Sequence, residues 1–340
     1  MFEKFINDAV WSCNLKYIRM MRITKEKFFE SLLKKVSKEE YAKQIRKLWD
    51  VDHNFMDKAI EELDKIVKDK DIKLAKKYGD NKIVQRSIKL ENSWQDYDNK
   101  DYQIYKLNPE RDFVIMEQRY VNRHIKYYEN TQKGLELAQD KDAYLTKIVP
   151  KYDNIDKSIP YYNHATGTIR CYQTIATYNS MLFNWNLTHS AWNRTEYDGK
   201  LLGNNLYYLV AHPGACPSCM EYQGFVYAED TPTKEETRVL MKYGKRGEYM
   251  KEQAIRGGVG HPNCKHSWTL FWDYDQIQED KFNSSYWEEE YEIEQKKQSL
   301  DLEKSRLLSD RRIYQELGDQ SKVDDINNKI KAIRNKKKEL

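Results

Sequence analysis

Hydrophobic residues in the first 150 positions recur every three to four residues, the spacing of one face of an α-helix. One such segment follows Thr24. A second has Ser37 and Glu40 in the arrangement of a capping box at its start. A third runs from about Asp52 to Gly79. We therefore predict successive helices over this part of the chain.

A polar stretch then leads to a long helical pattern that begins at Asn108 and Pro109, a cap followed by proline at the first helical position. We expect a break in this helix near Gly134, because glycine weakens helix interiors. Residues 1–150 are thus predicted to form a helical N-terminal region. The next positions, 150–165, lack sustained periodicity, so we expect a domain boundary there.

The pattern changes after this boundary. Apolar residues from Ile169 to Leu182 indicate a helix. Three short segments rich in β-branched and aromatic residues then indicate strands, and two helical stretches separate the second from the third. The strands are expected at 206–212, 224–229 and 268–273, and the helices at 233–243 and 247–256. Residues 160–280 are therefore predicted to form a small α+β domain.

Residues 285–340 are predicted to form a charged helical hairpin. Gly318 is expected to end its first helix, and Ser321 is expected to cap the second. Four apolar residues share one face of that second helix: Val323, Ile326, Ile330 and Ile333. The predicted fold class is α+β, with long helices at both ends and a short β-sheet between them.

Composition supports a polar chain without a membrane span. Hydrophobic residues make up 39% of the 340 residues, and mean hydropathy is −0.94. No apolar run approaches the length of about 18 residues that a spanning helix needs, and the start lacks the pattern of a secretory signal. The net charge of +4 is concentrated in the last ten residues, which hold five basic groups and one acid. We expect no general attraction of the remaining chain for nucleic acid.

Cysteine and histidine residues are clustered in the predicted α+β domain. Cys216 and Cys219 form a C-x2-C pair, and HPNCKH places His261, Cys264 and His266 together further along the chain. Thiolates and imidazoles in such spacing are typical ligands of a tetrahedral Zn²⁺ ion. We predict a closed structural zinc site formed by the three thiols and one histidine, His261 in preference to His266.

Two other interpretations of this cluster stay open. Cys216 and Cys219 would suit a C-x-x-C redox pair, although the surrounding pattern is not that of a thioredoxin-like unit. They would also suit unligated thiols in a loop. His212 is a further candidate ligand, since the cluster offers more donors than a tetrahedral ion accepts.

The strings that carry this cluster resemble those of the minor capsid, or Mu F-like head-morphogenesis, proteins of tailed bacteriophages. HPGACPSCMEYQGFVY from His212 and NCKHS from Asn263 are similar to one branch, and HPNCKH is similar to a sister branch. Cys216 and Cys219 stand where the first branch has Arg and His, and His266 stands where the second has Cys. The resemblance covers roughly residues 160–340.

The resemblance implies a structural virion protein rather than an enzyme. Such a protein would lie in the capsid interior or at the portal vertex, after synthesis in the host bacterial cytoplasm. Its implied partners are the portal protein, major capsid or scaffold proteins, and packaged double-stranded DNA. Its implied role is procapsid assembly, DNA packaging or DNA delivery.

Two alternative functions follow from other features. A metal-dependent nuclease would use His261, Asn263 and His266 around a catalytic metal. The other alternative is a DNA-binding protein of a mobile element. DNA contact would instead depend on the basic tip, defined as Lys331, Arg334, Lys336, Lys337 and Lys338. A basic helix end that only complements its own dipole is the simpler explanation of this tip.

Overall fold

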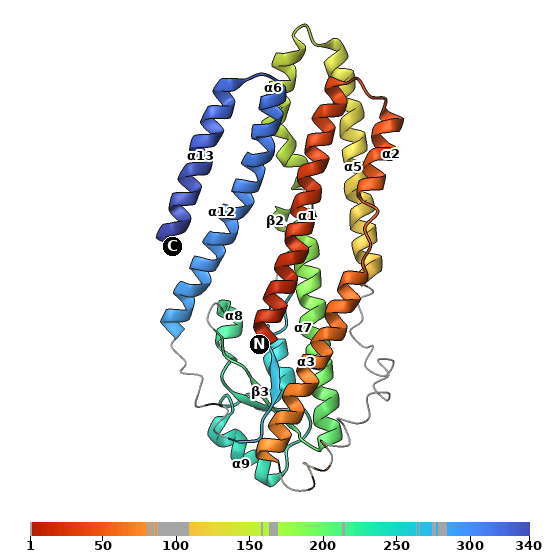
Figure 1. The fold of residues 1–340 in the computed structure, drawn as a ribbon. Coiled ribbons are helices and arrows are strands. Elements are labelled where there is room, and N and C mark those ends of the chain that lie inside the picture. The colour runs from red at the N-terminus through yellow and green to blue at the C-terminus, as the bar shows by residue number, and fades with distance from the viewer. Residues whose placement is uncertain are drawn as a thin grey trace. The chain divides into compact units, whose positions relative to one another are not determined.

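The computed structural model is mostly helical with small antiparallel sheets (Figure 1). It describes residues 2–79, 109–157, 159–162, 169–212, 215–262, 264, 266–273 and 284–340, with positions 82, 85, 87 and 277. None of the helices in these ranges combines the length and apolar character that a bilayer crossing requires.

The helices and strands follow in chain order. The helices are α1 (Phe2–Leu33), α2 (Lys38–Leu48), α3 (Asn54–Tyr78), α5 (Pro109–Leu137), α6 (Lys141–Asp156), α7 (Ile175–Leu202), α8 (Pro217–Met220), α9 (Lys234–Tyr243), α10 (Lys251–Arg256), α12 (Ser284–Glu316) and α13 (Gln320–Glu339). The strands are β1 (Ile159–Tyr162), β2 (Ile169–Gln173), β3 (Leu206–Leu209), β4 (Val226–Ala228) and β5 (Trp268–Leu270).

The chain packs into two compact units, each built from segments that are distant in sequence. The sheet unit comprises residues 1–10, 54–107 and 181–292. The helical unit comprises residues 11–53, 108–180 and 293–340. The expected division into consecutive regions 1–150, 160–280 and 285–340 remains a prediction.

Aromatic side chains form the centre of the helical unit. Phe28 of α1 lies with its ring centroid 4.9 Å from that of Tyr152 of α6, and Tyr41 of α2 stacks on Tyr128 of α5 at 3.9 Å. All four side chains are fully buried. Tyrosine supplies a large apolar area while its hydroxyl keeps a polar partner, as where Tyr128 donates to the Val36 carbonyl.

A buried cation joins three helices of the same unit. The Lys25 ammonium of α1 lies 2.7 Å from Asp153 of α6 and is also paired with Asp310 of α12. Burial alone would lower the Lys25 pKa, but the two carboxylates raise it above its usual value. The charged form of Lys25 is therefore favoured, and it holds α12 against α1 and α6.

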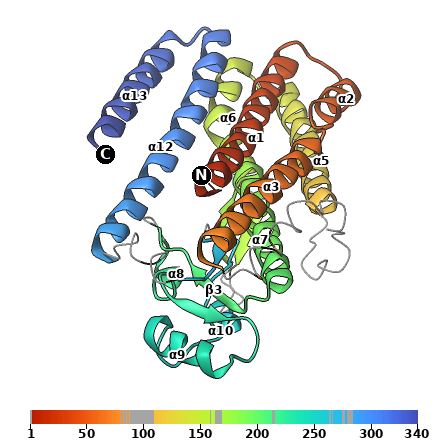
Figure 2. The ribbon, with the colours of Figure 1, turned by 60° about the horizontal axis from the view of Figure 1, so that its bottom comes forward.

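A three-stranded antiparallel sheet organises the sheet unit (Figure 2). Strand β3 lies in the middle, with Tyr207 paired to Tyr227 of β4 on one side and to Leu270 of β5 on the other. The strands are only three or four residues long, and their side chains are buried. Trp192 of α7 packs against Trp268 of β5 in the same core.

Most predicted elements are confirmed. Strands β3, β4 and β5 lie inside the three segments expected from the sequence, and α9 and α10 lie in the two helical stretches between them. Helix α3 matches the segment expected from Asp52 to Gly79, and Ser37 caps α2 by accepting the Glu40 backbone N–H. The N-cap expected at Asn108 lies outside the described residues.

Two expectations about helix boundaries are wrong. Thr24 does not begin a helix, because α1 starts at Phe2 and the Thr24 hydroxyl donates to the Met20 carbonyl one turn back. Gly134 does not break α5, which continues to Leu137. A side chain at Gly134 would place its Cβ 2.1 Å from the Tyr144 hydroxyl, so this glycine permits close approach of α6.

The region around residues 150–175 also differs from expectation. Helix α6 continues through Pro150 to Asp156, and β1 then pairs antiparallel with β2, where a helix beginning at Ile169 was expected. Strands of four and five residues are too short to show a clear alternation. In the C-terminal hairpin, Asp319 rather than Ser321 caps α13, while its four apolar residues are buried as predicted.

Replacing Lys25 with Met should destabilise the chain by about 3–5 kcal/mol, because two partly buried carboxylates lose their buried counter-ion. Chemical denaturation of the full chain measures this change. Lys34→Met is the matched control, since Lys34 pairs with Glu30 on the exposed surface of the same helix region. It should cost less than about 1 kcal/mol. Equal losses in the two variants would contradict a structural role for the buried cation.

Candidate functional site

The C-x2-C pair occupies a single helical turn beyond the end of strand β3. Cys216 is the N-cap residue of α8, and its carbonyl accepts the backbone N–H groups of Cys219 and Met220 at 3.0 Å each. Pro217 at the first helical position favours this turn. The turn brings two thiols three residues apart to the same region, as the spacing predicts.

The second half of the cluster lies in the loop that precedes strand β5. Helix α7 holds this loop through its backbone carbonyls. Asn184 donates to the Cys264 carbonyl at 2.9 Å, and Trp192 donates to the His266 carbonyl at 2.9 Å. Further donors on the same helix are Trp185 and His189 to Gly260 and Thr188 to Cys264.

A glycine in this loop permits the close approach to α7. Gly260 has a φ of +87°, which favours glycine, and a Cβ there would lie 2.6 Å from the Trp192 ring. The cysteine and histidine spacing does not point to the α7 side chains as part of the site. The sequence feature that could have indicated them is a stripe of polar and aromatic residues at positions 184, 185, 188, 189 and 192. These positions are spaced so that they share one face of a helix.

The five predicted side chains lie close enough to bind a metal ion, in two groups that share Cys219. One group is Cys216, Cys219 and His261, and the other is Cys219, Cys264 and His266. Within each group the ligand atoms lie within 4.8 Å of one another. The chain therefore brings together residues that are about 45 positions apart.

Several separations match the edges of a zinc tetrahedron. Zn–S bonds near 2.3 Å and Zn–N bonds near 2.0–2.1 Å imply edges of about 3.8 Å between sulfurs and about 3.5 Å between sulfur and nitrogen. The Cys219 and Cys264 sulfurs are 3.8 Å apart, and the Cys264 sulfur is 3.5 Å from His266 Nδ1. The donor chemistry and these distances fit a soft divalent ion such as Zn²⁺.

Electrostatics favour thiolate at two of the three cysteines. The Cys219 thiol and then His261 lower the pKa of Cys216 to about 4, against the effect of burial. Burial opposes ionisation of Cys264, yet its contacts with Cys219 and His266 lower its pKa. Cys219 takes the proton in this arrangement, so its pKa is raised. A bound cation would favour the thiolate form of all three.

The basic tip lies at the end of α13, where Lys331, Arg334, Lys336 and Lys338 are exposed. Lys337 differs from them because its ammonium lies 2.7 Å from Asp301 on α12. This ion pair ties the two helices of the C-terminal hairpin together and neutralises one charge of the tip.

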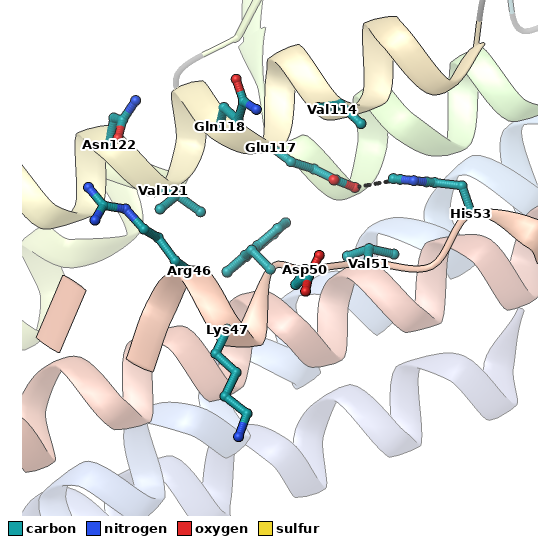
Figure 3. Close-up of a pocket in the computed structure, with 11 residues that line it drawn as sticks. Arg46, Lys47, Asp50, Val51, His53, Val114, Glu117, Gln118, Val121 and Asn122 are labelled. Carbon is teal, nitrogen blue, oxygen red and sulfur yellow. Dashed lines mark hydrogen bonds and ion pairs between the residues drawn. The ribbon is translucent and has the colours of Figure 1, made fainter. Parts of the chain in front are cut away.

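A cavity of about 620 Å³ lies in the helical unit between α2, the loop after it and α5 (Figure 3). Glu117 and His53 point toward one another at its wall, 3.1 Å apart, and the Tyr17 hydroxyl donates to the same Glu117 oxygen at 2.6 Å. The nearby Cys13 thiol is buried, which raises its pKa to about 12. Sequence spacing could not reveal this network, because its members are separated by up to 100 residues.

Residues 186–340 match a family model described as phage minor capsid protein 2. No curated protein and no solved structure matches the chain. The matched residues include all five candidate ligands and the C-terminal hairpin. They agree with the family resemblance expected from the sequence.

Cys219→Ser should lower the melting temperature of the full chain, and a chelator should lower that of the unmodified chain to a similar value. The chelator should have little effect on the variant, because the variant has already lost the ligand shared by both groups. Thermal unfolding with and without chelator measures both effects.

Cys13→Ala provides the control, since Cys13 is buried in the helical unit and belongs to neither metal-ligand group. It should destabilise the chain by the same amount with or without chelator. A chelator that leaves the unmodified chain unaffected would contradict a structural metal and favour unligated thiols.

Proposed function

We propose that this chain, whose residues 186–340 match a phage minor capsid protein family, is a structural protein of a tailed-phage head. The family match carries this proposal. The protein would join the procapsid near the portal or in the head interior. There it would act in assembly, DNA packaging or DNA delivery, with the portal, major capsid or scaffold proteins as partners.

A structural metal fits this role. The sheet unit holds its three-stranded sheet with strands of three or four residues, which offer few ladder hydrogen bonds to fix the long excursions between them. Zn²⁺ bound to Cys216, Cys219, Cys264 and one histidine would cross-link the loop after β3 to the loop before β5. When bound, the ion supplies folding free energy directly.

The three thiols also favour a structural site over a hydrolytic one. A catalytic zinc site keeps one position open for water, whereas three thiolates and one imidazole fill all four positions. The five donors of this cluster exceed that number. The nuclease alternative considered from the sequence is therefore not proposed.

DNA contact is proposed for the exposed part of the basic tip. Packaged DNA presents a dense array of phosphates, and exposed lysines bind phosphates without sequence preference. Lys336 and Lys338 are exposed on the last turn of α13, while Lys337 is engaged by Asp301. The tip would accordingly make fewer phosphate contacts than its five basic residues suggest.

Mass spectrometry of purified virions from the phage that encodes this chain should detect the protein at low copy number. Chemical cross-linking of procapsids should join it to the portal protein. A chain that is abundant in infected cells and absent from both procapsids and virions would overturn the capsid proposal.

Replacing both Lys336 and Lys338 with Gln should reduce the log–log salt dependence of DNA binding by about 1.8, from about 0.9 per phosphate contact. DNA titrations at several salt concentrations measure this slope. Lys337→Gln is the matched control, and it should leave the slope nearly unchanged. An unchanged slope in the double variant would assign the tip to the helix dipole alone.

A further inference from the structure

Gln223 and His266 lie on either side of the end of strand β3. Gln223 is in the turn that leads from α8 into β4, where the next residue, Gly224, donates its backbone N–H to the Leu209 carbonyl. His266 is in the loop that leads into β5. Both side chains are 1% exposed, and His266 Nε2 lies 2.8 Å from Gln223 Oε1.

The backbone fixes the orientation of the Gln223 amide. The His212 backbone N–H lies 3.1 Å from the same amide atom, and a backbone N–H can only donate. The atom between His212 and His266 must therefore be the carbonyl oxygen of Gln223. Because this oxygen can only accept, the hydrogen of the neutral His266 ring lies on Nε2.

The lone pair of the neutral His266 ring is consequently on Nδ1. This atom is the one that faces the Cys264 sulfur, at 3.5 Å. The peptide carbonyl of His266 is held separately by Trp192 of α7 at 2.9 Å. Backbone and ring of His266 are thus each held by a protein contact.

We propose that Gln223 is a positioning residue that presents Nδ1 of His266 to the metal, and that His266 rather than His261 is the histidine ligand. This inference rests on the structural metal site proposed above. Metal-binding histidines commonly donate their other ring N–H to a carbonyl or carboxylate, which fixes the tautomer. Gln223 supplies that acceptor from inside the sheet unit.

The contact made by His261 supports a different role for that residue. Its Nε2 lies 3.0 Å from the Cys216 sulfur, shorter than the edge of about 3.5 Å that two ligands of one zinc ion require. His261 therefore pairs with Cys216, while Cys219, Cys264 and His266 form the group whose ligand atoms all lie within 4.8 Å of one another. Cys216 lies outside that group, so its sulfur would have to move toward the group to become the fourth ligand.

The experiment compares Gln223→Met with the unmodified full chain, using Zn²⁺ as the probe. Methionine keeps the length of the side chain but removes the acceptor. The variant should bind Zn²⁺ about 10–100-fold more weakly, as expected for loss of a hydrogen-bond partner of a ligand. Histidine ring ¹⁵N NMR of the Zn²⁺-bound unmodified chain should show coordination through Nδ1 of His266 with the hydrogen on Nε2.

Two further variants separate positioning from a merely structural effect. Gln223→Glu keeps an acceptor oxygen and should restore most of the affinity. Thr188→Val removes a buried hydrogen bond to the Cys264 carbonyl without touching a ligand side chain. It should lower the stability of the chain while leaving the His266 coordination mode unchanged.

The outcomes distinguish the role of Gln223 and His266 from the proposal that the chain binds a structural metal. An unmodified chain that binds no Zn²⁺ would overturn both the proposed structural metal site and the role of Gln223. A chain that binds Zn²⁺ through Nε2 of His261 would overturn the assignment of His266 alone. Equal Zn²⁺ affinities of Gln223→Met and the unmodified chain would overturn the positioning role alone.

Discussion

The sheet unit depends on one set of hydrogen bonds, those that α7 donates to the backbone carbonyls of residues 260–266. A loop buried against a helix must satisfy its carbonyls inside the protein, because an unpaired buried carbonyl costs free energy comparable to a lost hydrogen bond. Asn184, Trp185, Thr188, His189 and Trp192 supply the donors. The same bonds place Cys264 and His266 beside Cys219.

Protein hydrogen bonds hold both segments that carry the candidate metal ligands. The loop that carries Cys264 and His266 is oriented by protein contacts, and the turn that carries Cys216 and Cys219 is closed by its own backbone hydrogen bonds. An ion would thus join two segments that protein hydrogen bonds also hold. In the helical unit, segments distant in sequence are linked by an ion pair instead of a metal. The buried Lys25 ammonium joins three helices through two carboxylates.

Sequence spacing predicted the metal-binding residues as a set but not their individual roles. Cysteine and histidine are few in this chain, so their clustering was visible without a structure. The choice between His261 and His266 depends on the Gln223 amide, which is 43 residues away from His266 in sequence, and on the His212 backbone N–H. Gln223 lies in the string that carries the family resemblance, but that string does not show which histidine the amide contacts until the fold places it.

The difference between local sequence signals and tertiary contacts also explains the errors in the predicted fold. Long amphipathic helices such as α3 show many repeats of their period, whereas β1 and β2 offer four and five residues each. Thr24 has the side chain of a cap, but its hydroxyl bonds to the Met20 carbonyl and also accepts from Trp49 of the next helix. Local propensity suggested a boundary there, and tertiary contacts made that residue part of a helix interior.

The segment that matches the phage minor capsid family is not a complete packing unit. Residues 186–292 contribute to the sheet unit, whereas residues 293–340 contribute to the helical unit. Asp310 lies in the matched segment, yet the cation that it binds, Lys25, and the second carboxylate, Asp153, lie outside it. Ala75 of α3, also outside the match, belongs to the core that contains Trp192 and Trp268. The matched segment alone would leave a buried carboxylate without its cation and a core without part of its packing, so the function proposed here belongs to the full chain.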